Sequence, residues 1–153
     1  MGIFEQYLGA HAFFEGIAKQ YLAILGERTV HANFSGGEFL FHAGTPANQF
    51  YLVQHGKVAL QLSAPGMRTS IMQTIGDNEV IGWSWFFPPY QWHFDAKALV
   101  PTRTLALDGE WLRQMCEEDH ELGYLIMKRV ANVLVERLQN ARLQMLDFYG
   151  NRS

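Results

Sequence analysis

The middle of the sequence is a series of short runs separated by turn residues, and this pattern constrains the fold more than any other feature. The runs are rich in aromatic and β-branched residues, and they occupy residues 29–34, 39–42, 50–54, 58–63 and 69–75. Gly, Pro, Asn or Asp occurs in the segments that separate them. Short strands at this spacing are typical of an antiparallel sandwich, barrel or roll. A further strand is expected over residues 96–107.

Helical patterns flank this β region on both sides. Between residues 11 and 25 apolar side chains recur at helical spacing, and Gly26 is expected to end that helix. Asp108 is expected to cap a short helix, and Asp119 a long one that continues to Tyr149. The sequence therefore predicts a mainly β fold with flanking helices (α+β). Its parts are an N-terminal helical part (1–28), a β part (29–107) and C-terminal helices (108–149).

Composition narrows the class of protein. The chain has 153 residues, 48% of them hydrophobic and 18% charged, which predicts a single domain (1–153) with a real core. A net charge of −3 gives no general attraction to nucleic acid or to anionic membranes. The N-terminus lacks a signal-peptide pattern, and no run approaches the roughly 18 apolar residues of a membrane span. We expect a cytoplasmic protein with no membrane partner.

The stretch from residue 82 to 98 concentrates aromatic side chains in what should be a loop. It contains three Trp, three Phe, one Tyr and one His, and its adjacent Pro88 and Pro89 prevent a continuous helix. Loops normally lie at the surface, where so much aromatic area is unfavourable unless something covers it. We therefore expect this loop either to fold into the core or to line a binding site.

Residues 40–58 resemble the first signature of cyclic nucleotide-binding domains. Gly44, Ala47, the apolar run 50–53 and Gly56 match that signature, and Phe41 is larger than the residue the family usually has. The order of elements along the chain is also similar to that of the family. The resemblance implies a double-stranded β-roll (jelly roll) of the catabolite-activator and fumarate-nitrate-regulator group. It places residues 82–98 at the phosphate-binding cassette.

The polar anchors of that cassette are missing from this sequence. In the family, a glutamate after the first glycine holds the ribose, and an arginine meets the phosphate. Gly82 and Ala96 match the frame, but Trp83 stands at the glutamate position and Phe94 at the arginine position. Asp95 adds a negative charge. Because a lost charge-assisted contact weakens binding strongly, we do not expect cyclic AMP to be bound in the usual way.

Two interpretations of the aromatic cassette remain open, and a third is weaker. The chain could be a regulatory or sensory module that binds another small molecule through the polar groups of the cassette side chains. Alternatively, it could be a ligand-free dimerisation or interaction module whose aromatic rings fill the old ligand space. A cyclic AMP or cyclic GMP receptor is the third. The candidate site residues are Gly82, Trp83, Ser84, Trp85, Tyr90, His93, Phe94, Asp95 and Ala96.

The long C-terminal helix carries two apolar stripes. The first alternates spacings of three and four residues from Tyr124 to Phe148, which is the pattern of a coiled-coil seam. The second covers only the first half of the helix, which we expect to pack on its own domain. We predict a parallel homodimer whose contact residues are Met127, Ala131, Leu134, Leu138, Ala141 and Met145.

Other functional classes find little support in the sequence. The six histidines show no His-x-His pattern, so a metal site is not expected, and no cofactor can be named. Acidic neighbours argue against Cys116 as a nucleophile, and no catalytic set is recognisable, so an enzyme is not expected. In transcription-factor relatives such a helix leads into a helix-turn-helix. Because the sequence stops at Ser153, we expect no direct sequence-specific DNA binding by this chain; the protein partner is unknown.

Overall fold

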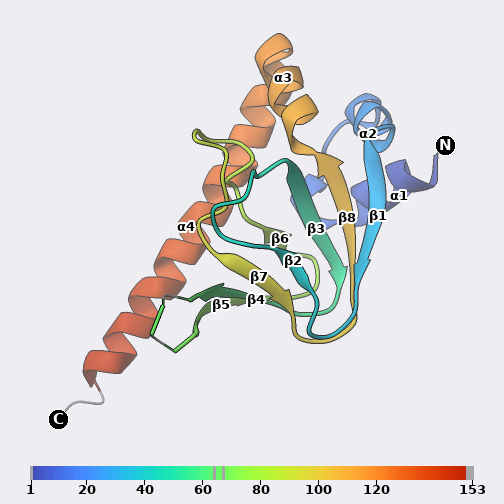
Figure 1. Ribbon diagram of the computed structural model, residues 1–153. Helices are drawn as coiled ribbons and strands as arrows, with labels where there is room; N and C mark the ends of the chain where they lie inside the picture. Colours follow the sequence, from blue (N-terminus) through green and yellow to red (C-terminus); the bar gives the residue numbers. More distant parts are fainter. Residues whose placement is uncertain (1, 64, 67, 151–153) are drawn as a thin grey trace. The chain divides into compact units, whose positions relative to one another are not determined.

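The computed structural model describes residues 2–63, 65–66 and 68–150, and the chain divides into two compact units, residues 1–114 and 115–153. The first unit holds the N-terminal helices, the strands and most of helix α3; the second holds the end of α3 and all of α4. Figure 1 shows the elements in order: α1 (Ile3–Ala10), η1 (Ala12–Phe14), α2 (Lys19–Gly26), β1 (Thr29–Phe34), β2 (Phe39–Phe41), β3 (Gln49–His55), β4 (Val58–Leu62), β5 (Ser70–Ile75), β6 (Val80–Ile81), β7 (Asp95–Ala98), β8 (Thr102–Asp108), α3 (Gly109–Glu118) and α4 (His120–Gly150).

The strands of the described residues form two antiparallel sheets of four strands each. Their orders are β1-β8-β3-β6 and β2-β7-β4-β5, so strands far apart in the sequence lie side by side (Figure 1). Strand β1 pairs along its whole length with β8, from Thr29 opposite Leu107 to Phe34 opposite Thr102. This arrangement confirms the predicted mainly β fold with flanking helices and its β-roll.

The predicted strand over residues 96–107 is in fact two strands in different sheets. Strand β7 ends at Ala98 and β8 begins at Thr102. Pro101, between them, has no amide hydrogen to donate to a ladder, and Leu99 and Val100 before it are exposed. The two-residue strand β6 was not predicted, because so short a run carries no periodic signal.

The predicted helix over residues 11–25 is present only in its second half, which ends at Gly26 as predicted; a continuous helix is wrong. The helical residues are instead α1, the single 3₁₀ turn η1 and α2, which begins only at Lys19. Gly16 adopts a left-handed φ of +80°, and Glu15 before it and Ala18 two residues after it have extended ψ angles. The apolar spacing predicted burial correctly for Phe13 but not a continuous helix.

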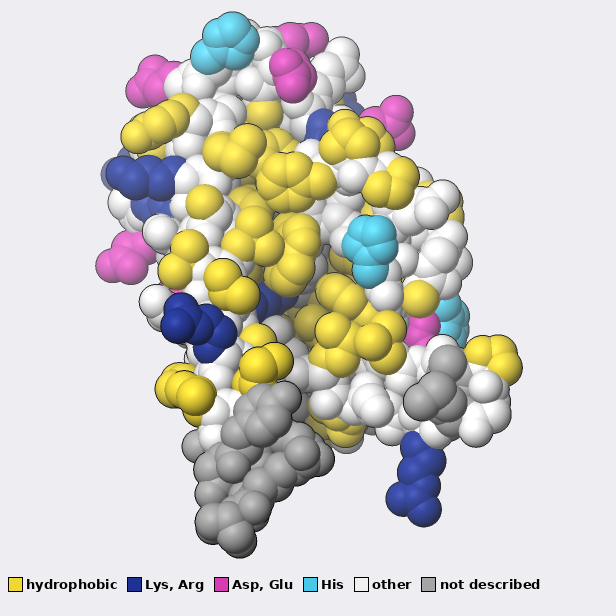
Figure 2. All heavy atoms as spheres, turned by 90° about the vertical axis from the view of Figure 1, so that its left-hand side faces the viewer, with side chains coloured by type: hydrophobic (Ala, Val, Ile, Leu, Met, Phe, Trp, Pro, Cys, Tyr) yellow, Lys and Arg dark blue, Asp and Glu magenta, His cyan; other side chains and the backbone are white. Residues whose placement is uncertain are grey.

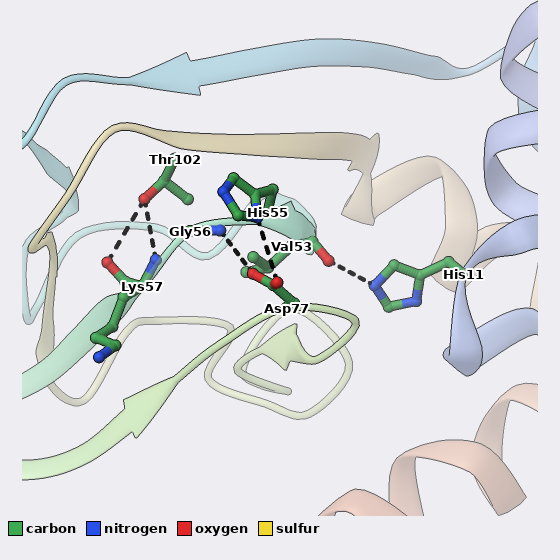
Figure 3. A network of polar contacts seen from close by, with 7 residues as sticks. All are labelled: His11, Val53, His55, Gly56, Lys57, Asp77 and Thr102. Atoms are coloured by element: carbon green, nitrogen blue, oxygen red, sulfur yellow. Dashed lines mark hydrogen bonds and ion pairs between the residues drawn. The ribbon is translucent and has the colours of Figure 1, made fainter.

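A buried histidine fixes this N-terminal segment to the β-roll. His11 Nδ1 accepts the amide hydrogen of Phe13 at 3.1 Å, and its Nε2 lies 2.9 Å from the carbonyl oxygen of Val53 in β3 (Figure 3). Because a carbonyl only accepts and an amide only donates, these partners require the neutral imidazole with its hydrogen on Nε2. Burial lowers the pKa of His11 from its ordinary value, against opposing backbone contacts.

The hairpin between β3 and β4 is closed by glycine and by an acidic cap. Gly56 has a φ of +137°, and a Cβ added there would lie 2.7 Å from the Cα of Thr102. Asp77 accepts the Gly56 amide hydrogen at 2.8 Å and contacts His55 Nδ1 at 3.2 Å (Figure 3). These contacts, the Gly56 amide first, lower the pKa of Asp77. Gly44 has a φ of +85°, so both signature glycines adopt a positive φ.

Both C-terminal helices begin at the predicted caps. Asp108 Oδ1 accepts the amide hydrogen of Trp111 at 3.1 Å, and Asp119 Oδ1 accepts that of Leu122 at 3.1 Å. Helix α4 then runs to Gly150, close to the predicted end. Across the described part of the chain, no helix combines the length and the apolar character that crossing a membrane would require.

Candidate ligand-binding cassette

The cassette is the loop between β6 and β7, and hydrogen bonds fix it to the turn between β2 and β3. The amide of Gly44 donates to Trp92 at 2.7 Å, that of Ala47 to Tyr90 at 2.8 Å, and that of Trp92 to Thr45 at 3.0 Å, each to the carbonyl oxygen. The turn between β2 and β3, which we call the signature turn, is therefore joined to the cassette by backbone hydrogen bonds.

Gly82 opens the cassette at a position that only glycine suits. Its φ is +76°, and a Cβ added there would lie 2.6 Å from Cζ3 of Trp92. A single turn follows, in which the Phe86 amide donates to the Trp83 carbonyl oxygen at 2.9 Å. The predicted interruption of helix at Pro88–Pro89 is present, and that peptide bond is cis.

Three of the seven Trp, Phe and Tyr side chains of the cassette are buried. Trp85 is 0% exposed, Trp92 3% and Phe94 7%. Trp92 stacks on Phe41 with ring centroids 3.6 Å apart and planes 6° from parallel. The residue that departs from the signature by its size, Phe41, is thus the partner of a cassette tryptophan. Trp85 stacks on Phe50 of β3 at 4.7 Å.

Ser84 is also buried, but the remaining aromatic side chains of the cassette are more accessible. Trp83, Phe86, Phe87 and Tyr90 are half-buried, and His93 is exposed. Trp83 meets Phe94 edge to face with centroids 6.5 Å apart, so the residues at the glutamate and arginine positions contact each other. The side chains that were predicted to offer polar groups to a ligand therefore differ in their solvent exposure.

Asp95 contacts the turn between β2 and β3. Its Oδ1 accepts the amide hydrogen of Ala43 at 2.7 Å and lies 3.6 Å from His42 Nδ1. This carboxylate holds the signature turn in place. The next residues alternate in burial: Ala96 and Ala98 are buried, while Lys97 is half-buried with its Nζ 5.5 Å from the Phe39 ring centroid.

Sequence reasoning missed Arg113, which reaches the cassette from α3. Its guanidinium donates to the carbonyl oxygen of Trp85 and lies 3.9 Å from the ring centroid of Tyr90. The contact joins residues 28 apart in sequence, and no local pattern marks it. The indole Nε1 of Trp85 is buried and has no hydrogen-bond partner within the described residues.

The predicted dimer residues of α4 are mostly at the surface, where Figure 2 shows hydrophobic side chains. Met127, Leu138 and Met145 are 46%, 63% and 61% exposed, Ala131 and Ala141 are also exposed, and Leu134 is half-buried. In the second stripe Leu122, Ile126 and Val130 are buried. The side chain of Phe148 lies outside the described residues. Sequence reasoning missed three further exposed apolar residues: Val135, Leu143 and Leu146.

The Cys116 thiol and the metal-ligating side chains are the other groups that the sequence offered for chemistry. Cys116 is buried, and burial, followed by Glu117 and Asp119, raises the pKa of its thiol to about 11. A thiol with so high a pKa is a poor nucleophile at neutral pH. Within the described residues, no group of three or more His, Cys, Asp or Glu side chains could hold a metal ion.

Comparison with known proteins gives a consistent result. The family model "Cyclic nucleotide-binding domain" matches residues 31–119. A CRP-like cAMP-activated global transcriptional regulator of Mycobacterium tuberculosis is 23% identical over 143 residues, which are 94% of this chain and 62% of that protein. The chain therefore spans less than two thirds of the length of this curated relative.

Solved structures show the same fold. A candidate cyclic nucleotide-binding protein from Geobacter metallireducens superposes with a TM-score of 0.79 at 25% identity, covering 90% of this chain and 99% of that one. The regulatory subunit of a cAMP-independent protein kinase A from Trypanosoma brucei gives a TM-score of 0.69 at 17% identity, covering 95% of this chain and 50% of that one.

Proposed function

The chain belongs to the cyclic nucleotide-binding domain family, and we propose that it is a regulatory, non-catalytic module that does not bind cyclic AMP in the usual way. In this proposal its own aromatic side chains occupy the space in which relatives hold the nucleotide. The relative from Mycobacterium tuberculosis is a transcriptional regulator, which supports a regulatory role.

The burial of Phe94 is the observation that carries this proposal. The resemblance places a phosphate-binding arginine at this position, where the chain has a phenyl ring that is 7% exposed. That ring lies 6.5 Å from Trp83 and 6.3 Å from Phe41, centroid to centroid. A phosphate brought here would lose its hydration and meet aromatic rings in place of a cation, which is strongly unfavourable.

The relative from Trypanosoma brucei supports the same conclusion at the level of fold. That protein is described as the regulatory subunit of a cAMP-independent kinase. The β-roll is thus found in a regulatory protein described as working without this nucleotide. At 17% identity the likeness concerns the fold alone, so the argument for this chain rests on Trp83 and Phe94.

We further propose that the module is a homodimer joined through α4. Its exposed seam residues repeat at alternating spacings of three and four, as parallel coiled coils require. Leaving Tyr124, Leu138 and Met145 in water is unfavourable, and a second copy of the same helix offers a matching surface.

A second candidate function is the sensing of a different small molecule. One observation favours it: the buried Nε1 of Trp85 has no partner among the described residues, and a buried donor of this kind is stabilised by an acceptor. Such a ligand would be largely apolar with one hydrogen-bond acceptor, because the same indole stacks on Phe50 and contacts the tilted ring of Phe86.

Native mass spectrometry of the protein purified from cells distinguishes these functions. We expect the mass of a dimer without a bound small molecule. A stoichiometric adduct with the mass of a cyclic nucleotide would contradict the proposal. An adduct of another mass, released on denaturation, would favour the second candidate, and Trp85→Phe should then weaken its retention.

A further inference from the structure

We propose that Arg113 is an internal latch that holds the cassette against α3 without any ligand. The proposal goes beyond the regulatory role above and does not depend on it, because the latch is formed by the chain's own atoms. In the family an arginine supplies the cation of the cassette, and here Phe94 stands at that position. We assign the cationic contact of this cassette to Arg113, which lies outside it.

The latch uses both properties of a guanidinium. One N–H of Arg113 donates to the carbonyl oxygen of Trp85, and the planar group lies 3.9 Å from the ring centroid of Tyr90. These two residues belong to opposite halves of the loop, one before and one after Pro88–Pro89. A single side chain therefore ties both halves of the cassette to one helix.

The helix that carries Arg113 is itself fixed next to the cassette. Gly109, its first residue, donates its amide hydrogen to the carbonyl oxygen of Asn48 at 2.8 Å. A Cβ added to Gly109 would lie 2.9 Å from the Cβ of Trp85, so the helix start and the cassette are in close contact. Leu112 is fully buried beside Arg113 in sequence and anchors this turn of the helix.

The guanidinium cannot be replaced by another cation without loss. A lysine ammonium is a compact, strongly hydrated charge that cannot donate in the plane of a carbonyl while it stacks face-on with a ring. Arg113 is also half-buried, so its contact with Tyr90 is stronger than it would be in open water. The latch therefore depends on the shape of the side chain as well as on its charge.

A closed cassette without ligand follows from these contacts. In a loop held only by a ligand, amide exchange is slow when the ligand is bound and fast when it is not. Here the latch should keep the amides of residues 83–94 protected in the free protein. The cassette is then a constitutive part of the fold, held to residues 109–113 of α3 within the first compact unit.

Hydrogen–deuterium exchange on the full chain tests the latch. In Arg113→Ala and in Arg113→Lys, we expect amides within residues 83–94 to exchange about tenfold faster or more than in the wild type, since neither side chain can make both guanidinium contacts, with the Trp85 carbonyl oxygen and with the Tyr90 ring. Strands β3 and β8 should keep their wild-type rates. The matched control is Arg28→Lys, because Arg28 lies 5.2 Å from the Trp111 ring of the same helix and is not among the cassette contacts.

The outcomes are distinct. Faster exchange confined to the cassette in both Arg113 variants, with none in Arg28→Lys, supports the latch. Cassette exchange at the wild-type rate in both variants overturns it, and so does an equal acceleration of the cassette and of β3 and β8. Adding cyclic AMP to Arg113→Ala separates the two proposals: slower cassette exchange would contradict the proposed function and leave the latch intact.

Discussion

Phe94 marks the position at which this chain departs most from a nucleotide receptor, and it can be tested by restoring the family's residue. We predict that Phe94→Arg lowers the free energy of unfolding by about 3–5 kcal/mol, because it places a charge without a partner in a buried aromatic cluster. Chemical denaturation followed by tryptophan fluorescence measures this change.

The adjacent residue provides the control for that substitution. His93 is exposed, so His93→Arg should change the free energy of unfolding by no more than about 0.5 kcal/mol. If Phe94→Arg were as mild as His93→Arg, the site would be open to water, and the filled cassette would have to be abandoned.

His11 links stability to pH. Burial lowers its pKa in the folded protein below the ordinary 6.5, so the unfolded chain takes up the proton first as the pH falls. The contribution of His11 to the free energy of unfolding is therefore complete above about pH 6.5 and declines as the pH falls below that value. Denaturation curves at a series of pH values measure the decline.

A substitution isolates the contribution of His11. His11→Gln removes the titrating group while its amide can still donate and accept, so the decline between pH 6.5 and lower values should become smaller. His93→Gln, at an exposed site, should leave the slope as in the wild type. An unchanged slope in His11→Gln would assign the pH dependence to other groups.

At the scale of elements, α4 carries the clearest prediction. Leu134→Glu combined with Leu138→Glu places like charges in the proposed seam and should convert a dimer to a monomer. Light scattering coupled to size exclusion measures the mass, and circular dichroism shows whether helix content is retained. A wild-type protein that is already monomeric contradicts the predicted dimer.

The control variants lie on the same helix away from that seam. Asn132 and Gln139 are exposed and fall at positions between the seam residues on the outer face. Asn132→Glu combined with Gln139→Glu adds the same charge, and this variant should stay dimeric. If both pairs dissociate the protein, net repulsion rather than the seam would be responsible.

Elements with a strong local sequence pattern could be predicted. Elements whose bounds depend on an unusual backbone conformation at one residue could not. The strands from β1 to β5, both helix caps and the length of α4 follow from apolar runs, turn residues and Asp side chains. The N-terminal helices could not be placed. The apolar residues there recur at helical spacing and several are buried, but the positive φ of Gly16 interrupts the helix between them. Arg113 could not be found, since its partners lie far away in sequence.

At the scale of the whole molecule, the fold and the family follow from a few residues. Gly44 and Gly56 sit at positive φ in the turns that the signature requires, and the strand between them crosses the core. The candidate site is harder to predict, because burial of a side chain depends on contacts made across the β-roll. The stacking of Trp92 on Phe41 and the turn-holding role of Asp95 are contacts of this kind.

Offering the family's ligand to the protein tests the filled cassette most directly. Isothermal titration calorimetry of the wild-type chain with cyclic AMP, and separately with cyclic GMP, measures this directly. With Trp83 and Phe94 at the two anchor positions, we predict no saturable binding up to about 1 mM nucleotide. Saturable binding of one nucleotide per chain with a Kd of about 1 μM would contradict the central claim that the cassette is filled by its own aromatic side chains.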